Sequence, residues 1–473
     1  MKLNYGDGDG DGDGDGDGFQ KKDLYTSMKA TKILIVLVLI TTEFCEADHY
    51  FGSVTLYKDA LKLWKSHTDF QVPGLEGFEE EDIIGREHSA GGGTPNLRYN
   101  KSVLILAPIS QTEPFEKWKQ SFDESEAQKL VAVGADEIYN IGKRYKKHFP
   151  ELLADTYSSE HYDLVHTTQS RTKDTAKSWA KAIFGDNFKD EDNLKVNNTL
   201  LRFYKKCKKW KEEIDEADIS TVEERRFMNS KVFKHMIKDV SRKLGFTKPS
   251  ETLSQETIDT IFESCRYQYT TNKKRISPWC AAFDEDHIEI LEYLDDLDHY
   301  WKDSYGFELN YKQACEPLRD LLDNIRLSVT GESKMKGIFR FTHQGFMQKF
   351  YSRLGLFKDP RPLTASWWSS SAFPPTCANS TTGDDDTRDE TVADSDVGQR
   401  LYRLSETGPF TANIAFVLYN CKDGYKVKTF VQEHEIKLPD CSEMLCDLNE
   451  FQEAYQEFVQ DCDIRSLCNY NYP

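Results

Sequence analysis

Two regions of the chain alternate short β-type runs with helical patterns. In the first, the β-prone run Tyr162–His166 passes through a turn-like TTQS stretch into a helix. That helix is defined by apolar residues at helical spacing: Ala176, Trp179, Ala180 and Ile183. In the second, GIFRFT at 337–342 leads into a helical pattern, and a β-type run returns over Asn413–Cys421. Such alternation predicts an α/β domain.

The stretch from about 200 to 325 is helical almost throughout. Ser254 is placed to cap a helix, and two apolar stripes at i, i+3, i+4 and i+7 spacing follow it. The stripes are Ile258, Ile261, Phe262 and Cys265, then Ile290, Leu294, Leu297 and Trp301. A further helix is predicted over 120–147, with acidic residues early and lysines late, as the helix dipole favours. The economical account is an α/β domain interrupted by a helical insertion.

The amino terminus reads as two segments that lie outside the domain. YGDGDGDGDGDGDG at 5–18 has no apolar group to bury and lacks the ligand spacing of an EF-hand loop, so residues 1–27 are predicted not to belong to the mature protein. From Met28, two lysines precede an apolar run, and small residues follow it at a plausible cleavage point. This pattern is typical of a signal peptide at 28–47, and the run is too short for a membrane span.

The predicted organisation follows from these segments. Residues 48–200 form the first part of the α/β domain, 201–325 the helical cap and 326–473 the second part. Within the last part, 369–400 is polar, acidic and poor in core-forming residues, so it is predicted as a loop or disordered insert. We expect a secreted or lumenal protein that starts near Asp48, with no transmembrane segment in the mature chain.

Cysteines and glycosylation signals fit the same route. Ten of the 11 cysteines lie after the predicted leader, an even number that favours disulfides in an oxidising compartment. Their pairing does not follow from spacing, although Cys462 and Cys468 are close enough to form a local pair. Zinc is the weaker alternative, because no CxxC doublet with a histidine partner occurs. Sequons lie at Asn100, Asn197 and Asn379.

Composition limits the class of ligand. The chain has 473 residues, of which 38% are hydrophobic and 30% charged, with a formal net charge of −19. This balance argues against nucleic-acid binding, which needs a basic footprint. An anionic ligand would need a local basic patch, for which the lysine cluster Lys205, Lys206 and Lys208 is a candidate. The alternative for the same cluster is a solvated lysine face. The acidic run at 284–286 is predicted as the first turn of a helix and not as a metal site, and His287 and His299 are expected to be exposed.

Two polar residues come directly after predicted strands. Arg171 follows the run at 162–166, and His343 follows the run at 337–342. In open α/β sheets, ligands bind beyond the carboxyl ends of the strands, so both side chains are predicted to face one crevice. Arginine suits a phosphate there, because its planar fork offers two parallel charge-assisted bonds. The alternatives are a helix-capping histidine and a solvated arginine.

Several collinear stretches resemble the histidine acid phosphatase superfamily, and within it the multiple inositol polyphosphate phosphatases. They include HTTQSRTKDTAKSWAKAIFG, FYKKCKKWKEEIDE, SPWCAAFDEDHIEILEYLDDLDHYWKDSYGFELN, FTHQGFMQKFYSRLGLFKDPRPLTA and GPFTANIAFVLYNC. The similarity covers roughly residues 116–368 and 400–468. It implies a mixed or parallel sheet flanked by helices with an inserted all-α cap, acting on phosphorylated small molecules without a metal or cofactor.

The resemblance also implies roles for individual residues. Family members attack phosphorus with the histidine of an Arg-His-Gly motif, and water then hydrolyses the phosphohistidine. Arg171 matches the family's downstream phosphate-binding arginine, and His343 matches its second histidine. The expected activity is hydrolysis of inositol polyphosphates or phosphoglycerates.

The sequence departs from the family pattern in two places. The family's proton-donor segment, His-Ala-Glu or His-Asp, reads His343-Gln344-Gly345 here, and glutamine has no acidic proton to give. Arg-His-Gly occurs nowhere in the chain. His88 in GREHSAGGGTP is a weak nucleophile candidate, whereas VLILAPISQTEP at 103–114 has the strand but neither arginine nor histidine. Either the protein is an inactive relative that binds phosphorylated ligands, or a segment of the sequence has been lost or replaced.

Overall fold

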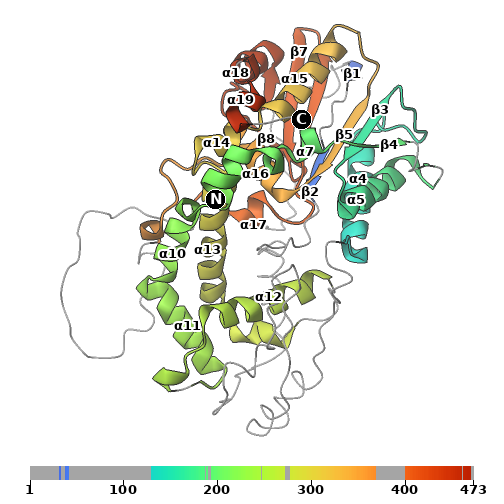
Figure 1. Cartoon of the computed structure of the whole chain (residues 1–473). Helices are drawn as coiled ribbons and strands as arrows, with labels where there is room; N and C mark the ends of the chain where they lie inside the picture. Colours follow the sequence, from blue (N-terminus) through green and yellow to red (C-terminus); the bar gives the residue numbers. More distant parts are fainter. Residues whose placement is uncertain are drawn as a thin grey trace, which may run out of the picture.

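The computed structural model describes two short stretches near the amino terminus and most of the chain after residue 128. The described residues are 31–33 and 38–41, for their backbone, and 129–186, 188–189, 193–246, 248–271, 277–368, 400–460 and 462–469. Figure 1 shows the strands gathered at one end of the molecule, with α10, α11, α12 and α13 extending away from them.

The strands form two sheets. The strands are β1 Thr31–Ile33, β2 Val38–Thr41, β3 Tyr162–His166, β4 Leu194–Val196, β5 Gly337–Thr342, β6 Ile414–Cys421, β7 Gly424–Val431, β8 His434–Ile436 and β9 Leu445–Asp447. One sheet has the order β2-β5-β3-β4 and all its pairings are parallel. The other runs β1-β6-β7-β8 with β9 beside β7, all antiparallel. The arrangement is the predicted mixed sheet.

Helices occupy most of the remaining described chain. They are α4 Ala132–His148, α5 Ser170–Phe184, α7 Asn198–Leu201, α8 Phe203–Lys206, α9 Lys208–Trp210, α10 Val222–Met228, α11 Lys231–Lys243, α12 Gln255–Thr271, α13 Glu285–Asp303, α14 Glu308–Lys312, α15 Cys315–Val329, α16 Gln344–Arg353, α17 Leu404–Thr407, α18 Leu448–Gln460 and α19 Ile464–Cys468. Short 3₁₀ or π turns join several of them. The helix expected over 120–147 begins later, at Ala132, as far as the described residues reach.

The alternation along β5 places a hydrophobic core on each face of the sheets. Phe339 and Phe341 point into one core, with residues of α4 and α5. Ile338, which precedes Phe339 in the strand, points into the other core, with residues of α15, α16 and α18. Successive side chains of a strand face opposite ways, so one strand supplies both cores. The result is a helix–sheet–helix sandwich.

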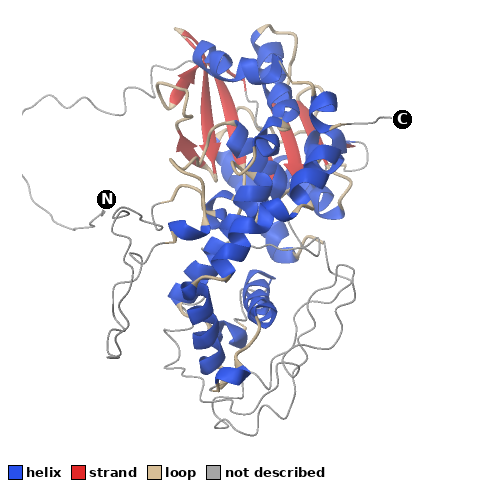
Figure 2. Ribbon diagram, turned by 60° about the vertical axis from the view of Figure 1, so that its left-hand side comes forward, coloured by secondary structure: helices blue, strands red, loops and turns tan. Residues whose placement is uncertain are grey.

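The helical block has a core of its own. Residues of α10, α11, α12 and α13 form it, and Leu363, Trp367, Trp368 and Tyr402 from the second part of the chain join them. Both predicted stripes lie in it, and Ser254 caps α12 by accepting from the Thr257 amide at 3.2 Å. Figure 2 shows these helices standing apart from the strands. Leu201–Ile214 and the α15 residues instead pack against the sheet. The fold is therefore an α/β domain with an inserted helical cap.

The two amino-terminal strands differ from the signal-peptide prediction. β1 pairs antiparallel with β6, and β2 pairs parallel with β5, although both lie inside 28–47. A leader that is cleaved cannot supply strands of the mature sheet, so the two assignments exclude each other. The physical reason for the ambiguity is that an apolar run rich in isoleucine and valine fits both a leader and a buried strand.

Four disulfides join described cysteines. They are Cys207–Cys468, Cys265–Cys280, Cys315–Cys462 and Cys441–Cys446. The suggested local pair was therefore wrong, because Cys462 lies against Cys315 at the start of α15 and Cys468 lies against Cys207 between α8 and α9. Cys421 has no disulfide partner among the described cysteines, and Cys377 lies outside the described residues.

Within the described part of the chain, no helix combines the length and the apolar character that crossing a bilayer requires. In the same residues, no group of three or more histidine, cysteine or carboxylate side chains is arranged to hold a metal ion.

Candidate active site

The parallel sheet brings three chain segments to one edge. Because β5, β3 and β4 run the same way, their carboxyl ends lie side by side. His343 follows β5 and is the N-cap residue of α16, with extended backbone angles of −132° and 161°. Thr167 follows β3, and Asn197 follows β4 and caps α7 through its side chain. Arg171 sits in the first turn of α5, four residues after Thr167.

Arg171 and His343 converge at this edge. Arg171 Nη2 lies 3.2 Å from His343 Nδ1. Their exposed fractions are 4% and 1%, so both are buried. The structure therefore brings together the two residues that the sequence placed at a common crevice.

The contacts fix the tautomer of the His343 ring. Arginine only donates hydrogen bonds, so Nδ1 accepts and the neutral ring carries its proton on Nε2. Nε2 lies 3.0 Å from Thr167 Oγ1, to which it donates. The Thr167 hydroxyl lies 2.8 Å from that of Thr172, which in turn donates to the Gln169 carbonyl at 2.8 Å. The ring is held at both nitrogens.

Among the described residues, the charges that shift the pKa of His343 are positive. Burial lowers the pKa of His343 well below its usual value, and the cations Arg171, Arg202 and Lys205 lower it further. Unlike charges attract and like charges destabilise one another, so a bound anion would relieve this repulsion. The site therefore holds a neutral imidazole among cations and is suited to an oxyanion.

The β4–α7 junction braces the β3–α5 turn beside this site. Asn198 Oδ1 accepts from the Thr168 amide at 2.9 Å, and Asn198 Nδ2 donates to the Thr168 hydroxyl at 2.9 Å. The Asn197 amide donates to the His166 carbonyl at 3.0 Å. These bonds hold the segment that carries Arg171 in register with the segment that leads to Arg202.

The three lysines of the predicted cluster differ in how close they lie to His343. Lys205 acts on His343, as described, and lies 3.9 Å from Asp215. Lys206 donates to the Thr199 hydroxyl at 2.7 Å, and Lys208 pairs with Glu212 at 3.6 Å on the surface. Of the three lysines predicted to bind substrate, Lys205 is the one whose charge reaches the His343 ring.

Arg202 and Thr167 are site residues that the sequence analysis missed. Arg202 lies between α7 and α8, three residues before Lys205. A sequence signal for Arg202 existed, because it comes soon after β4 of the parallel sheet. That strand has only three residues, which are mostly exposed, so it was not recognised. Thr167 was included only in a turn-like stretch.

Gln344, the residue after His343, has no acidic proton to donate and forms a structural contact instead. It is 2% exposed, and its amide donates to the Gly408 carbonyl at 3.4 Å. The side chain thus connects α16 to the segment before β6.

Several other sequence predictions can be placed. Asp284 is the N-cap of α13, as the acidic run predicted. His287 and His299 were expected to be exposed, but both are buried, because α13 packs on all sides in the cap. Asn197 lies at an exposed helix start. His88, Asn100 and Asn379 lie outside the described residues.

Comparison with known proteins identifies the family to which this chain belongs. A sequence profile of the Histidine phosphatase superfamily (branch 2) matches residues 96–434. The chain belongs to this superfamily. The matched range includes the cap, Arg171, Arg202 and His343, so the cluster of positive charge lies inside the family's own domain.

Similar proteins within the superfamily include curated relatives. Multiple inositol polyphosphate phosphatase 1 of Drosophila melanogaster is 28% identical over 351 residues, which cover 73% of this chain and 68% of the relative. The protein of the same name from Homo sapiens is 23% identical over 363 residues, covering 72% and 68%.

Solved structures agree on the fold. The phytase from D. castellii has a TM-score of 0.61 at 14% identity, over 93% of this chain and 82% of that one. Bifidobacterium longum Multiple Inositol Polyphosphate Phosphatase in complex with inositol hexasulfate has a TM-score of 0.50 at 14% identity, over 66% and 76%.

Proposed function

We propose that the protein is a phosphatase that hydrolyses phosphomonoesters of inositol polyphosphates, or of phosphoglycerates, at the site around His343. The observation that carries this proposal is the convergence of Arg171, Arg202 and Lys205 on one buried neutral imidazole. Membership of the histidine phosphatase superfamily supports the reaction class. The names of the relatives support inositol polyphosphates as the substrate class.

In the proposed reaction, a nucleophilic histidine nitrogen attacks phosphorus as the ester P–O bond breaks. The leaving oxygen takes up a proton, and water then hydrolyses the P–N bond to release phosphate. Arg171 and Arg202 would bind the equatorial oxygens, and their charge would stabilise the transition state more than the ground state. Once protonated, His343 would donate to a phosphate oxygen through Nδ1, the nitrogen that accepts from Arg171 in the free protein. His88 stays the candidate nucleophile from the sequence.

A second candidate is a non-catalytic protein that binds phosphorylated ligands with the same pocket. The observation that favours it is the lack of Arg-His-Gly anywhere in the sequence. The binding residues would serve this function equally well, because anion recognition needs the cations and not the nucleophile.

One assay separates the two candidates. Purified protein is incubated with inositol hexakisphosphate at mildly acidic pH, and released phosphate and trapped phosphohistidine are measured. Release that is lost in His343→Ala and His88→Ala supports the enzyme with His88 as nucleophile. Tight binding without release supports the binding protein, and absence of both binding and release contradicts both.

We propose that the protein works in an oxidising compartment of the secretory pathway. Four disulfides among the described cysteines support this, since such bonds persist where glutathione does not reduce them. Sequencing the amino terminus of the exported protein tests the leader at 28–47. A start near Asp48 supports cleavage, whereas retention of 31–41 supports β1 and β2 as strands of the mature fold.

A further inference from the structure

Lys349 is a fully buried cation near the proposed phosphate site. It lies on α16, six positions after His343, and is 0% exposed. Its ammonium forms an ion pair with Asp303, the last residue of cap helix α13, and donates to the Lys302 carbonyl at 3.2 Å. A buried charge is tolerated only when it is paired and hydrogen-bonded, so this contact joins the cap to α16.

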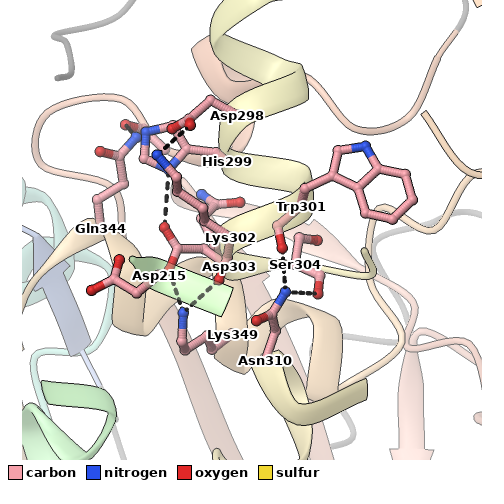
Figure 3. Close-up of polar contacts among 12 residues, drawn as sticks. Asp215, Asp298, His299, Trp301, Lys302, Asp303, Ser304, Asn310, Gln344 and Lys349 are labelled. Atoms are coloured by element: carbon pink, nitrogen blue, oxygen red, sulfur yellow. Dashed lines mark hydrogen bonds and ion pairs between the residues drawn. The ribbon is translucent and has the colours of Figure 1, made fainter. Parts of the chain in front are cut away.

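Asp303 has a second partner, His299 (Figure 3), and a close neighbour, Gly345. Its Oδ2 lies 3.1 Å from His299 Nδ1 on the preceding turn of α13. Burial alone would keep this carboxyl protonated, but Lys349 and His299 outweigh it and hold the Asp303 pKa well below its usual value. The carboxylate lies against Gly345, where an added Cβ would come within 3.3 Å of Oδ1. An ionised carboxylate thus touches the first turn of α16, two residues after His343.

The Lys349 ammonium also contacts an aromatic ring. Lys349 Nζ lies 4.1 Å from the centre of the Trp210 ring, a cation–π distance. Trp210 Nε1 donates to the Lys302 carbonyl at 3.1 Å and to Asn310 Oδ1 at 2.9 Å. The Lys302 carbonyl, in the last turn of α13, therefore accepts from both Lys349 and Trp210, and the helix dipole favours a cation at this end.

Opposite charges continue from Lys349 toward the phosphate site. Burial lowers the pKa of Lys349, and the negative charges of Asp303 and then Asp215 oppose that shift. Asp215 also lies 3.9 Å from Lys205. Lys205 is one of the three cations that act on His343. Charges of alternating sign thus run from the end of the cap helix to the imidazole.

We propose that Lys349 is a positioning residue of the phosphate site, fixing the first turn of α16, and with it the His343 ring, against cap helix α13 through its pair with Asp303. The inference rests on the proposed function, because it assumes that His343 and Arg171 bind phosphate. The alternative is a purely structural ion pair whose loss lowers stability and leaves the site unchanged.

The test is calorimetric titration with inorganic phosphate well below the unfolding temperature. Lys349→Met keeps the length of the side chain and removes its charge. We expect Kd to rise about tenfold or more, because small misplacements of a binding group are costly. The ¹³Cε1–¹H NMR signal of His343 should move in the same variant. Wild-type Kd and an unmoved signal in this variant would overturn the proposal.

Two further variants keep the test decisive if Lys349→Met folds poorly. Gly345→Ala changes no charge and favours helix, but its methyl group pushes on the Asp303 carboxylate. It should weaken phosphate binding without a matching loss of stability, and wild-type affinity would count against positioning.

The double variant Asp303→Asn/Lys349→Met leaves no charge unpaired, so it should regain stability but not phosphate affinity. Recovery of both would overturn the proposal.

Arg266→Met is the matched control. Arg266 is another buried cation of the cap, which lies 2.9 Å from Asp295 and donates a hydrogen bond to Glu263, all within α12 and α13. The Arg266→Met variant should be less stable than the wild type but bind phosphate with the wild-type Kd. A loss of affinity equal to that of Lys349→Met would show that general destabilisation causes the effect. If the wild-type protein itself binds no phosphate, the proposed function fails first, which is a different result from failure of Lys349→Met alone.

Discussion

Arg171 and His343 meet at 3.2 Å although 172 positions separate them in the chain. The meeting depends on the parallel pairing of β3 with β5, which aligns His166 with Phe341 and so places the residues after both strands at one edge. The inserted cap is accommodated between these strands without disturbing their register. The two residues form the centre of the proposed phosphate site.

Removing either group should disable this site. We expect His343→Ala and Arg171→Met each to lower phosphomonoester turnover by about a hundredfold, since each removes a preorganised donor to the phosphoryl oxygens. Initial rates with inositol hexakisphosphate give the measurement. If the protein only binds, the same variants should weaken binding of the ligand in calorimetry.

Lys208→Met is the matched control for this pair. Lys208 is a surface lysine paired with Glu212, so both turnover and binding should stay at the wild-type level. Unchanged turnover and unchanged binding in His343→Ala would remove that residue from the site.

Phosphate binding should take up protons. In the free protein, burial and the cations Arg171, Arg202 and Lys205 hold the pKa of His343 well below its usual value, so the ring is neutral. A bound oxyanion favours the charged imidazolium and raises that pKa. Calorimetry of phosphate binding at pH 5.5 in buffers of different ionisation enthalpy measures the uptake.

The control for proton uptake is His343→Gln, which should bind more weakly and with a smaller uptake. Phosphate changes its own protonation near neutral pH, so the comparison is between variants at one pH. Equal uptake in wild type and variant would show that His343 does not titrate on binding.

The cap should be more stable at acidic than at alkaline pH. Burial, together with Asp295 and Asp259, raises the pKa of Glu263 from 4.5 to about 8, although Arg266 opposes the shift. The folded state therefore holds this proton more tightly than the unfolded chain does. The stabilisation that this difference provides is fully present below pH 4.5, the ordinary pKa of Glu263. It is lost as the pH rises through about 8, the pKa of Glu263 in the folded protein. Thermal unfolding between pH 5 and pH 9 should show a falling Tm.

Glu263→Gln supplies the comparison, because a neutral amide cannot titrate. Its Tm should fall less across the same pH range than that of the wild type. A Tm that rises from pH 5 to pH 9, or a variant with the wild-type slope, contradicts the expectation.

The disulfide Cys207–Cys468 should stabilise the protein strongly. It joins positions 261 residues apart and ties α19 to the start of α9. Replacing both cysteines by serine should cost about 2–5 kcal/mol of the free energy of unfolding, mainly because the unfolded chain gains freedom. Urea denaturation of the oxidised protein measures the loss.

Cys441–Cys446 is the internal reference for that experiment. Its two cysteines are 5 positions apart, so it closes a short loop, and its removal should cost less. An equal or larger loss for the short pair would contradict an explanation based on chain entropy.

Much of the fold could be predicted from local patterns. The strand at Tyr162–His166, the Ser254 cap and the apolar stripes of α12 and α13 all follow from side-chain periodicity and capping within a few residues. The insertion of a helical cap into an α/β domain followed from the order of these elements. Those features are local, and short-range sterics and burial decide them.

Other predictions failed where contacts are distant in sequence. Cys462 and Cys468 were expected to pair as neighbours, yet they bond to Cys315 and Cys207. His299 was expected at the surface, but it lies buried beside Asp303. Both outcomes depend on segments distant in the sequence that pack around these residues.

The sequence by itself determined which elements form and which residues come at the ends of strands, because backbone propensity and burial patterns act over short distances. It thereby placed Arg171 and His343 at strand ends. Only the tertiary structure decided that Arg202 adds its charge to theirs and that Lys349 is buried against Asp303. The physical reason is that such charges meet only after the parallel strands and the cap helix have been brought together by packing.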